Sequence, residues 1–390
     1  MPVLNRIASF QDDMVAWRRQ IHRHPETAFE EHRTAAHVAA VLRSFGIAVE
    51  EGLARTGVVG RLAGGAGPGP AIGLRADMDA LHIAEQNDVP HRSQVDGKMH
   101  ACGHDGHTAM LLGAAKYLAE TRNFAGEVVF IFQPAEENEG GGRVMVEEGL
   151  FTRYPLQSVY GMHNWPGYEA GTIAVRPGPM MAAYDVFELT VTGRGCHAAM
   201  PQQGVDPVVT AAAIVTALQS LVSRNVDPLH SAVVSVTQIH GGDTWNVVPD
   251  AVVLRGTTRS FLPAVQDAIE AGIRRVAEGV CAAHGATLAM RYERRYPATV
   301  NTAPETENAA RAAGLVVGAA NVIHDPTPSM GSEDFAFMLQ ARPGSYVWLG
   351  NGTDSAKLHN ARYDFNDEVL AIGASYWATL VETILARSGS

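Results

Sequence analysis

The sequence has few cysteines and no long uninterrupted apolar run. Its 390 residues include three cysteines, Cys102, Cys196 and Cys281, an odd and small number that excludes a disulfide-stabilised scaffold. We find no apolar stretch approaching the roughly 18–20 residues that span a bilayer. The first residues also lack the basic-then-apolar order of a signal peptide. We therefore expect a cytoplasmic protein without a membrane partner.

Positive charge is scarce as well. Lysine and arginine number 30 against 41 aspartates and glutamates, which gives a formal net charge of −11. An acidic surface argues against non-specific binding to nucleic acid, so we expect no nucleic-acid partner. Hydrophobic residues make up 46% of the chain and charged residues 18%. This composition excludes wholesale disorder, and the length favours two or three domains.

Four short apolar runs are each followed by polar residues suited to catalysis or metal binding. The runs with their polar ends are AIGLRADMD (71–79), VVFIFQPAEE (128–137), SVYGMHN (158–164) and YVWLGN (346–351), the last followed by His359. Continuous apolar runs are typical of parallel strands buried on both faces. Helical spacing over 105–120 separates the first two, which indicates an α/β domain. Ligands bind at the carboxyl ends of such strands, so the pattern predicts one site there.

The middle of the chain has a different pattern. Residues 184–192 alternate apolar and polar side chains, as in a half-exposed antiparallel strand, and helical patterns cover 207–223 and 265–284. The predicted order β-α-β-β-α-β matches the ferredoxin-like arrangement. We therefore predict a small α+β domain inserted into a larger α/β domain. The predicted boundaries are 1–182 with 296–390 for the larger domain and 183–295 for the insertion.

The densest group of reactive side chains is HACGHDGH, residues 100–107. Cys102 and His104 are strong ligand types for zinc, and carboxylates extend the choice towards Mn²⁺. Glu136 and Glu137 follow a predicted strand, and neighbours in an extended segment point in opposite directions. One of them can therefore bind metal while the other faces a water molecule, which is the minimum equipment for hydrolysis.

Each of these residues also has a plainer interpretation. Cys102 could be a small buried residue, the glutamate pair a solvated turn, and His163 an ordinary hydrogen-bonded histidine. With His359, however, five ligand-type residues occupy five successive topological positions at one edge of the predicted sheet. That combination favours a metal site over five unrelated residues.

The chain resembles the metallopeptidase M20 family, and within it the amidohydrolase branch of hippurate hydrolases, N-acyl-amino-acid amidohydrolases and auxin-conjugate hydrolases. HACGHDGH combined with PAEE is the most specific part of the resemblance. The matching segments span nearly the whole chain: RRQIHRHPETAFEE (18–31), LRADMDAL (74–81), MHACGHDGHTAMLLGAA (99–115), FQPAEENEGGG (132–142), GMHNWPG (161–167), GRGCHAAMP (193–201), NVVP (246–249), MGSEDF (330–335) and LHN (358–360). The resemblance implies a zinc-peptidase-like catalytic domain of mainly parallel sheet, with the insertion as a ferredoxin-like lid and dimerisation domain.

The resemblance also implies roles for individual residues. Glu136 would be the general base, while Asp77 and Asp79 would lie behind the ligands and orient them. One or two divalent ions per subunit are implied, zinc or manganese first, with cobalt or nickel as alternatives. Asp77-Met-Asp79 replaces the family's usual His-x-Asp, and a cysteine stands in place of the bridging aspartate, which leaves the number and identity of the metals open. The implied ligands are Cys102, His104, Glu137, His163 and His359.

In the inserted domain, His197 matches a histidine that reaches the active site of a neighbouring subunit and stabilises the oxyanion. Asn246 and Arg259 match positions that bind the α-carboxylate of the substrate. A packed loop histidine and a structural salt bridge are the plainer alternatives for His197 and Arg259. A homodimer or higher homo-oligomer is implied.

The sequence thus predicts metal-dependent hydrolysis of the amide bond of N-acyl amino acids, small hippurate-like substrates, to a carboxylic acid and a free amino acid. A dipeptidase, a carboxypeptidase or an N-acetyl-diaminopimelate deacetylase could use the same site. A non-enzymatic ligand-binding protein on the same scaffold is the alternative from another class. That alternative predicts loss of the base or of a ligand, and the sequence retains all of them.

Overall fold

The computed structural model describes residues 4–386 and divides the chain into two compact units. The larger unit comprises Met1–Met180, Val300–Thr327 and Asp334–Ser390, and the smaller unit comprises Met181–Thr299 and Pro328–Glu333. The short segment Pro328–Glu333 packs with the smaller unit, whereas our boundaries placed it in the larger domain. The rest of the smaller unit is one continuous insertion in the chain.

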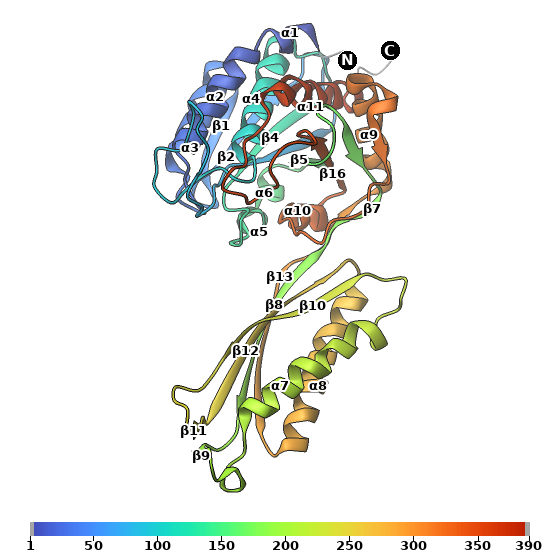
Figure 1. Ribbon diagram of the computed structural model, residues 1–390. Coiled ribbons are helices and arrows are strands. Elements are labelled where there is room, and N and C mark those ends of the chain that lie inside the picture. The colour runs from blue at the N-terminus through green and yellow to red at the C-terminus, as the bar shows by residue number, and fades with distance from the viewer. Residues whose placement is uncertain (1–3, 387–390) are drawn as a thin grey trace. The chain divides into compact units, whose positions relative to one another are not determined.

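The larger unit contains an eight-stranded sheet in the order β1-β2-β4-β3-β5-β16-β6-β15 (Figure 1). The central strands β4, β3, β5 and β16 are parallel to their neighbours in this group, whereas β1 and β2 are antiparallel. The predicted mainly parallel α/β sheet is confirmed. The strands are β1 (Ala48–Leu53), β2 (Gly57–Ala63), β3 (Ala71–Asp77), β4 (Glu127–Gln133), β5 (Ser158–Trp165), β6 (Ile173–Val175), β15 (Val322–His324) and β16 (Gly344–Gly350).

Helix α4 (His104–Thr121) packs on β3, β4 and β5, and α2, α3 and α11 pack around it. Its side chains are buried from His104 to Ala115, because it lies between the sheet and these other helices. The helix therefore starts at the edge of the sheet where the sequence predicts the site, and it runs from there through the core. The other helices are α1 (Asn5–Ala8), α2 (Gln11–Arg23), α3 (His32–Ser44), α5 (Gly141–Glu147), α6 (Leu150–Arg153), α9 (Ala303–Val317), α10 (Phe335–Ala341) and α11 (Leu370–Ile384).

The smaller unit has an antiparallel sheet in the order β10-β12-β8-β13, with α7 (Pro207–Ser220) and α8 (Pro263–His284) along one face (Figure 1). Burial alternates along β8, because every second side chain packs under the helices. Chain order and strand order together confirm the ferredoxin-like prediction. The strands are β8 (Ala183–Thr192), β10 (Ala232–His240), β12 (Ala251–Ser260) and β13 (Thr287–Tyr296), with a short ribbon of β9 (Cys196–His197) and β11 (Val247–Val248); β7 (Gly178–Met181) and β14 (Thr299–Asn301) form a separate pair.

One helical stretch in the described part of the chain, Pro207–Asn225, is long and apolar enough to cross a membrane by length and composition. Our expectation that no stretch approaches this length was wrong by that measure. The same test is passed by core helices of soluble proteins, and Ala211, Ile214 and Leu218 of α7 are buried in the core of the smaller unit.

Candidate active site

Four neighbouring strands of the large sheet end at the same edge. Because β4, β3, β5 and β16 are adjacent and parallel, their carboxyl ends lie side by side. Asp77 is the last residue of β3, and His163 lies two residues before the end of β5. Glu136 follows the end of β4 by three residues. The structure therefore collects the predicted residues of the larger unit at one edge.

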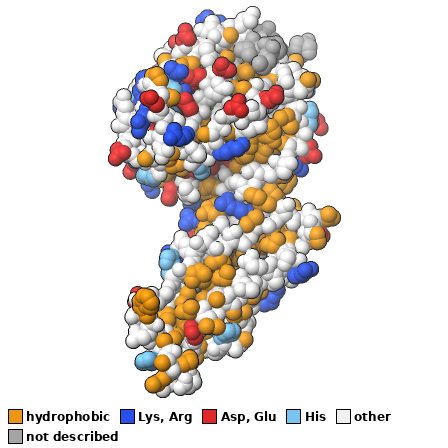
Figure 2. Space-filling view, viewed as in Figure 1, with side chains coloured by type: hydrophobic (Ala, Val, Ile, Leu, Met, Phe, Trp, Pro, Cys, Tyr) orange, Lys and Arg blue, Asp and Glu red, His pale blue; other side chains and the backbone are white. Residues whose placement is uncertain are grey.

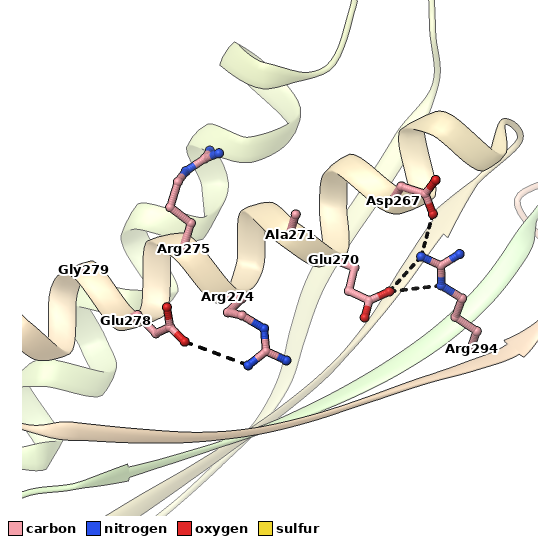
Figure 3. Close-up of a pocket in the computed structure, with 8 residues that line it drawn as sticks. All are labelled: Asp267, Glu270, Ala271, Arg274, Arg275, Glu278, Gly279 and Arg294. Carbon is pink, nitrogen blue, oxygen red and sulfur yellow. Dashed lines mark hydrogen bonds and ion pairs between the residues drawn. The ribbon is translucent and has the colours of Figure 1, made fainter.

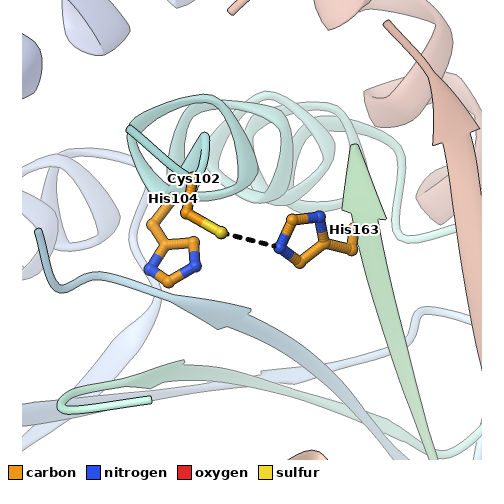
Figure 4. Close-up of side chains that lie close together, drawn as sticks. All are labelled: Cys102, His104 and His163. Atoms are coloured by element: carbon orange, nitrogen blue, oxygen red, sulfur yellow. Dashed lines mark hydrogen bonds between the residues drawn. The ribbon is translucent and has the colours of Figure 1, made fainter. Parts of the chain in front are cut away.

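Cys102 and His104 lie at the start of α4, and His163 on β5 faces them (Figure 4). All three are buried, and their ligand atoms lie within 4.8 Å of one another. Sγ of Cys102 is 3.3 Å from Nε2 of His163. Gly103, between the first two, has a φ of 96°, and a Cβ there would lie 2.1 Å from Nδ2 of Asn164. Only glycine fits this turn into the helix.

The imidazoles of His104 and His163 are each held by one nitrogen. Nδ1 of His104 lies 2.9 Å from the carbonyl oxygen of Asp79 and 3.1 Å from its Oδ1. Nδ1 of His163 lies 2.6 Å from the carbonyl oxygen of Asn164. Both rings therefore present Nε2 to the cluster, and the buried Nε2 of His104 has no hydrogen-bond partner among residues 4–386. A buried nitrogen in this state fits a metal ligand.

Glu137 and His359 complete the set. Oε1 of Glu137 lies 3.1 Å from Nε2 of His359, and both side chains lie within 4.8 Å of the Cys102 sulfur. The backbone amide of Glu137 donates to Oδ2 of Asp79 at 2.9 Å. His359 has a left-handed φ of 62°, and its amide donates to Ala101 at 2.8 Å. The two ligand groups share Cys102, as a bridging ligand would.

His107 and Asp77 lie behind the ligands. Nδ1 of His107 is 2.5 Å from Oδ1 of Asp77, and Nε2 accepts the backbone amide of Asn164 at 2.9 Å. Both ring nitrogens are therefore engaged, which agrees with a supporting role and not with ligation. Arg75 donates to Oδ2 of Asp77 at 2.6 Å, and Asp77 is fully buried.

Neighbouring carboxylates contribute to raised pKa values at Cys102 and His104, whereas burial and the charge of His107 lower the pKa of His163 well below its usual range. Burial, followed by the charges of Glu137 and Glu136, raises the pKa of the Cys102 thiol well above its usual range. Burial lowers the pKa of His104, but Asp77 and Asp79 outweigh it and raise the pKa to about 10. A thiol and an imidazole that both hold their protons mark a site whose carboxylates need a cation.

These observations show that the residues fit a metal. Cysteine sulfur, imidazole nitrogen and carboxylate oxygen are the donors that zinc and related divalent ions accept. The rings are oriented by hydrogen bonds on their far nitrogens, which is the usual support of a histidine ligand. Glu136 lies beside this set: it is 7% exposed, and one of its oxygens lies with Glu137 and His104 within 4.8 Å.

In the smaller unit, His197 and Asn246 lie near each other. His197 lies on β9, which pairs with β11, and the amide of Ala198 donates to the carbonyl oxygen of Asn246 at 2.9 Å. The side chain of His197 is exposed, and its Nδ1 accepts the amide of Ala199 at 3.0 Å. Nε2 of His197 is therefore the ring nitrogen open to a ligand.

Arg259 lies in a hollow of about 380 Å³ on the open face of the smaller unit's sheet. Its guanidinium stacks 4.2 Å from the ring of Tyr184 and donates to Oγ of Ser332 at 3.1 Å. Among residues 4–386, no carboxylate forms an ion pair with Arg259. A half-buried guanidinium without such a partner is suited to a carboxylate of a ligand.

The smaller unit does not bring these two groups together. His197 pairs with Val247, which precedes β12, whereas Arg259 is the ninth residue of that strand. Eight residues of extended strand span about 26 Å at ~3.3 Å per residue. One copy of the smaller unit therefore cannot place His197 and Arg259 on the same small molecule.

A second hollow lies on the solvent face of α8 (Figure 3). Arg294 donates to Asp267 at 2.6 Å and to Glu270 at 2.8 Å, and Arg274 lies 3.9 Å from Glu278. Paired charges of opposite sign are typical of a solvated helix face, so this hollow has no features of a catalytic site.

Sequence reasoning missed several residues that hold the site. Asn164 donates through Nδ2 to the carbonyl oxygen of Cys102 at 2.6 Å and accepts from the hydroxyl of Tyr363 at 2.6 Å. Arg75 joins Asp77 to Asp334. The position of Asn164 directly after His163 was the available signal. For Arg75 the sequence offered none, because Asp334 is 259 residues away.

Comparison with known proteins shows the family to which this chain is similar. The model of the family described as peptidase family M20/M25/M40 matches residues 73–383. The chain is 40% identical to a hippurate hydrolase of Campylobacter jejuni over 380 residues, which cover 97% of this chain and 98% of that protein. It is 39% identical to an N-acetylcysteine deacetylase of Bacillus subtilis, with the same coverage.

A solved structure of a related protein has a similar fold. The YXEP protein of Bacillus subtilis, described as a dinuclear metal-binding peptidase of the M20 family, superposes with a TM-score of 0.85. The two chains are 35% identical, and the match covers 98% of this chain and 100% of that one.

Proposed function

The chain belongs to peptidase family M20/M25/M40, and on that premise we propose that it is a metal-dependent amidohydrolase that cleaves N-acyl amino acids. The products would be a carboxylic acid and a free amino acid, as for a hippurate-like substrate. The names of the relatives, a hippurate hydrolase and an N-acetylcysteine deacetylase, support this reaction type. The observation that carries the proposal is the cluster of donor side chains around the buried Cys102, with Glu136 beside it.

One or two divalent ions would be held by the five residues of the cluster, with zinc or manganese favoured and cobalt or nickel as alternatives. When bound, such ions supply Lewis-acid activation of the amide carbonyl and of a water molecule. The structural support is the pair of overlapping donor groups that share Cys102. These donors are Cys102, His104, Glu137, His163 and His359.

Glu136 would take a proton from the attacking water and deliver it to the leaving amine. It differs from Glu137, whose Oε1 lies against His359 and whose amide is bound to Asp79. General bases act over hydrogen-bond distances, so the backbone on both sides of Glu136 must hold its carboxylate in place. That backbone is fixed by hydrogen bonds from the amides of Ala135 and Glu137 to the buried carboxylates of Glu31 and Asp79.

Arg259 would bind the α-carboxylate of the substrate through its planar guanidinium. Its position in a hollow, stacked on Tyr184 and without an ion-pair partner in the described chain, supports this role. Asn246 and His197 would complete the site from a second subunit, with His197 donating to the oxyanion of the tetrahedral intermediate. The separation of about 26 Å along β12 supports the second subunit, because one copy cannot supply both groups.

The surface of the smaller unit also supports a homodimer. Among the described residues, ten large apolar side chains are markedly exposed, and seven of these lie in this unit. Figure 2 shows apolar side chains on its visible face. A concentration of exposed apolar groups in one unit is typical of a protein–protein contact. The seven are Met200, Val208, Val209, Leu229, Ile239, Trp245 and Val247.

The test is a hydrolysis panel on protein reconstituted with Mn²⁺, Zn²⁺, Co²⁺ or Ni²⁺. Hippurate and N-acetyl amino acids should be cleaved, whereas preference for free dipeptides or N-acetyl-diaminopimelate would favour the alternative substrates. Glu136→Gln should abolish turnover and retain the metal, because it removes a base and not a ligand. If it loses the metal, the roles of Glu136 and Glu137 are exchanged. If no amide is cleaved with any metal, the chain is a binding protein.

Subunit mixing tests the dimer. His197→Ala should lower kcat by about 10²–10³, the usual cost of one oxyanion donor, and leave the metal content unchanged. In a mixed dimer of His197→Ala and Glu136→Gln subunits, one of the two sites is intact. Random exchange makes half of the dimers mixed, so roughly a quarter of the wild-type activity should return. No recovery despite proven exchange would place His197 outside a shared site.

A further inference from the structure

A buried glutamate, Glu31, links the site to the loop before α3. It belongs to the segment RHPETAFEE, for which the proposed reaction has no role. Its side chain is 0% exposed. Oε1 accepts the backbone amides of Phe29 at 3.0 Å and Ala135 at 2.9 Å, and Oε2 accepts the hydroxyl of Thr56 at 2.5 Å. Residues 31 and 135 are 104 positions apart, so this contact is purely tertiary.

The three partners of Glu31 lie in turns with unusual backbone geometry. Phe29 has a φ of 61° and Ala135 a φ of 54°, and Arg55, which precedes Thr56, has a φ of 70°. Left-handed conformations are unfavourable for residues with a Cβ and persist only where surrounding contacts fix them. One carboxylate therefore fixes turns from three separate segments of the chain.

The buried carboxylate of Glu31 forms no ion pair within residues 4–386. Burial, together with the charge of Asp79, raises the pKa of Glu31 to about 7. A buried carboxyl without a cation is a poor source of stability. Its three hydrogen bonds offset the cost of burying it, and an apolar side chain in its place would leave the buried amide of Ala135 and the hydroxyl of Thr56 without this acceptor. The role of Glu31 therefore lies in the segments that it binds.

Glu136 lies between two backbone amides that are bound by buried carboxylates. The amide of Ala135 donates to Glu31, and the amide of Glu137 donates to Asp79 at 2.9 Å. The loop that carries Glu31 is also joined to the residue after Asp79, because the amide of Ala80 donates to the carbonyl oxygen of Glu26 at 2.8 Å. The turn that carries Glu136 is therefore fixed on both sides.

We propose that Glu31 is a positioning residue that holds the turn at Ala135 and thereby aims the carboxylate of Glu136. This inference rests on the proposed function insofar as Glu136 is the base. A displacement of about 1 Å at a reacting group can cost about 10²-fold in rate. Loss of the Glu31–Ala135 bond should therefore lower kcat more than it changes KM, since the groups that bind the substrate lie elsewhere.

Two substitutions of Glu31 distinguish the effect of its side-chain length from the effect of its negative charge. Glu31→Asp keeps the carboxylate but shortens the side chain by one methylene, so its oxygens no longer reach the amide of Ala135. Glu31→Gln keeps the length and the acceptor at Oε1, while its amide group can donate to Thr56. Glu30→Asp and Glu30→Gln are matched controls, because the Glu30 side chain is 65% exposed and pairs with Lys98 at the surface.

The kinetic constants and the hydrogen-exchange protection of the turn should place the variants in the same order. Glu31→Asp should lower kcat by about 10- to 100-fold, with KM within about threefold of wild type and metal content unchanged. Glu31→Gln and both Glu30 variants should keep kcat within about threefold. By hydrogen exchange, peptides covering residues 133–141 should lose protection in Glu31→Asp and not in Glu31→Gln.

The proposal is overturned if Glu31→Asp keeps both kcat and protection, or if Glu31→Gln loses as much as Glu31→Asp. The second result would assign the effect to charge and not to the hydrogen bond. If wild-type protein cleaves no amide, the proposed function fails. The hydrogen-exchange protection of residues 133–141 in the variants then still decides whether Glu31 holds the turn.

Discussion

Raising the pH from 6 to 9.5 should destabilise the larger unit by roughly 3 kcal/mol through one buried histidine, His22. Its Nδ1 lies 2.8 Å from Oδ2 of Asp105, and its Nε2 lies 3.3 Å from Oε1 of Glu85. Ionised carboxylates only accept hydrogen bonds, so both ring nitrogens must carry protons. His22 is therefore an imidazolium, buried beside the first turn of α4.

The magnitude follows from the shift in pKa. Burial lowers the pKa of His22, but the hydrogen bonds to Asp105 and Glu85 outweigh it and raise the pKa to about 9. From the ordinary value of 6.5, at 1.36 kcal/mol per pKa unit, this shift gives roughly 3 kcal/mol. Because the folded pKa lies above the unfolded one, the stabilisation is fully present below about pH 6.5. It is lost as the pH rises through about 9.

The assay is urea unfolding of metal-loaded wild type and His22→Gln at pH 6, 7.5 and 9.5. The difference between their free energies of unfolding should shrink by roughly 3 kcal/mol across this range, while groups that titrate in both proteins cancel. His32→Gln, at an exposed position on α3, should show no such trend. A difference that stays constant from pH 6 to 9.5 would refute the imidazolium assignment.

Three other changes test the metal cluster and its support. Cys102→Ser should lower metal affinity at least about tenfold, because a hydroxyl is a poor substitute for a thiolate as a ligand. Competition with a chelator measures this affinity, and an unchanged value would exclude Cys102 as a ligand. Arg75→Met should lower the free energy of unfolding by about 3–5 kcal/mol, because it leaves two buried carboxylates without their cation; a loss below about 1 kcal/mol would contradict this. Gly103→Ala should reduce metal content, because its Cβ would overlap the side chain of Asn164, and a fully loaded variant would show that this turn can shift.

The sequence predicted the metal cluster because its residue types are distinctive and because the ends of parallel strands meet. β3, β4 and β5 brought Asp77, Glu136 and His163 to one edge, as their apolar runs indicated. His359 follows β16 by nine residues and reaches the cluster through a left-handed turn. The apolar run at 346–351 indicated that His359 follows a strand ending at this edge, but no periodicity encodes the turn that brings its side chain to the cluster.

The supporting hydrogen bonds were beyond prediction for a related reason. Arg75 has an ordinary place in a buried strand, and nothing local shows that its guanidinium meets a carboxylate 259 residues away. In the smaller unit, the sequence placed Arg259 on a strand, as found. It left a packed loop histidine as the plainer interpretation of His197, whereas the structure places this residue on the short strand β9 with an exposed side chain. The sequence did not show that His197 lies beyond the first residue of β12, whereas Arg259 lies near the last, so that one copy of the smaller unit holds the two residues far apart.

The two anchors beside Glu136 differ in what else they hold, and this difference can be measured. Asp79 binds the amide of Glu137 and also Nδ1 of His104, so it supports the base and the ligands together. Glu31 binds no ligand residue. Asp79→Ala should therefore lower both kcat and metal affinity, the latter by about 10- to 100-fold, as expected for a residue behind a histidine ligand. Glu31→Asp should lower kcat at full metal affinity. If both variants lose metal affinity equally, the position of the base and the position of the ligands depend on the same hydrogen bonds. If Asp79→Ala keeps full metal affinity, the backbone carbonyl of residue 79 is enough to orient His104.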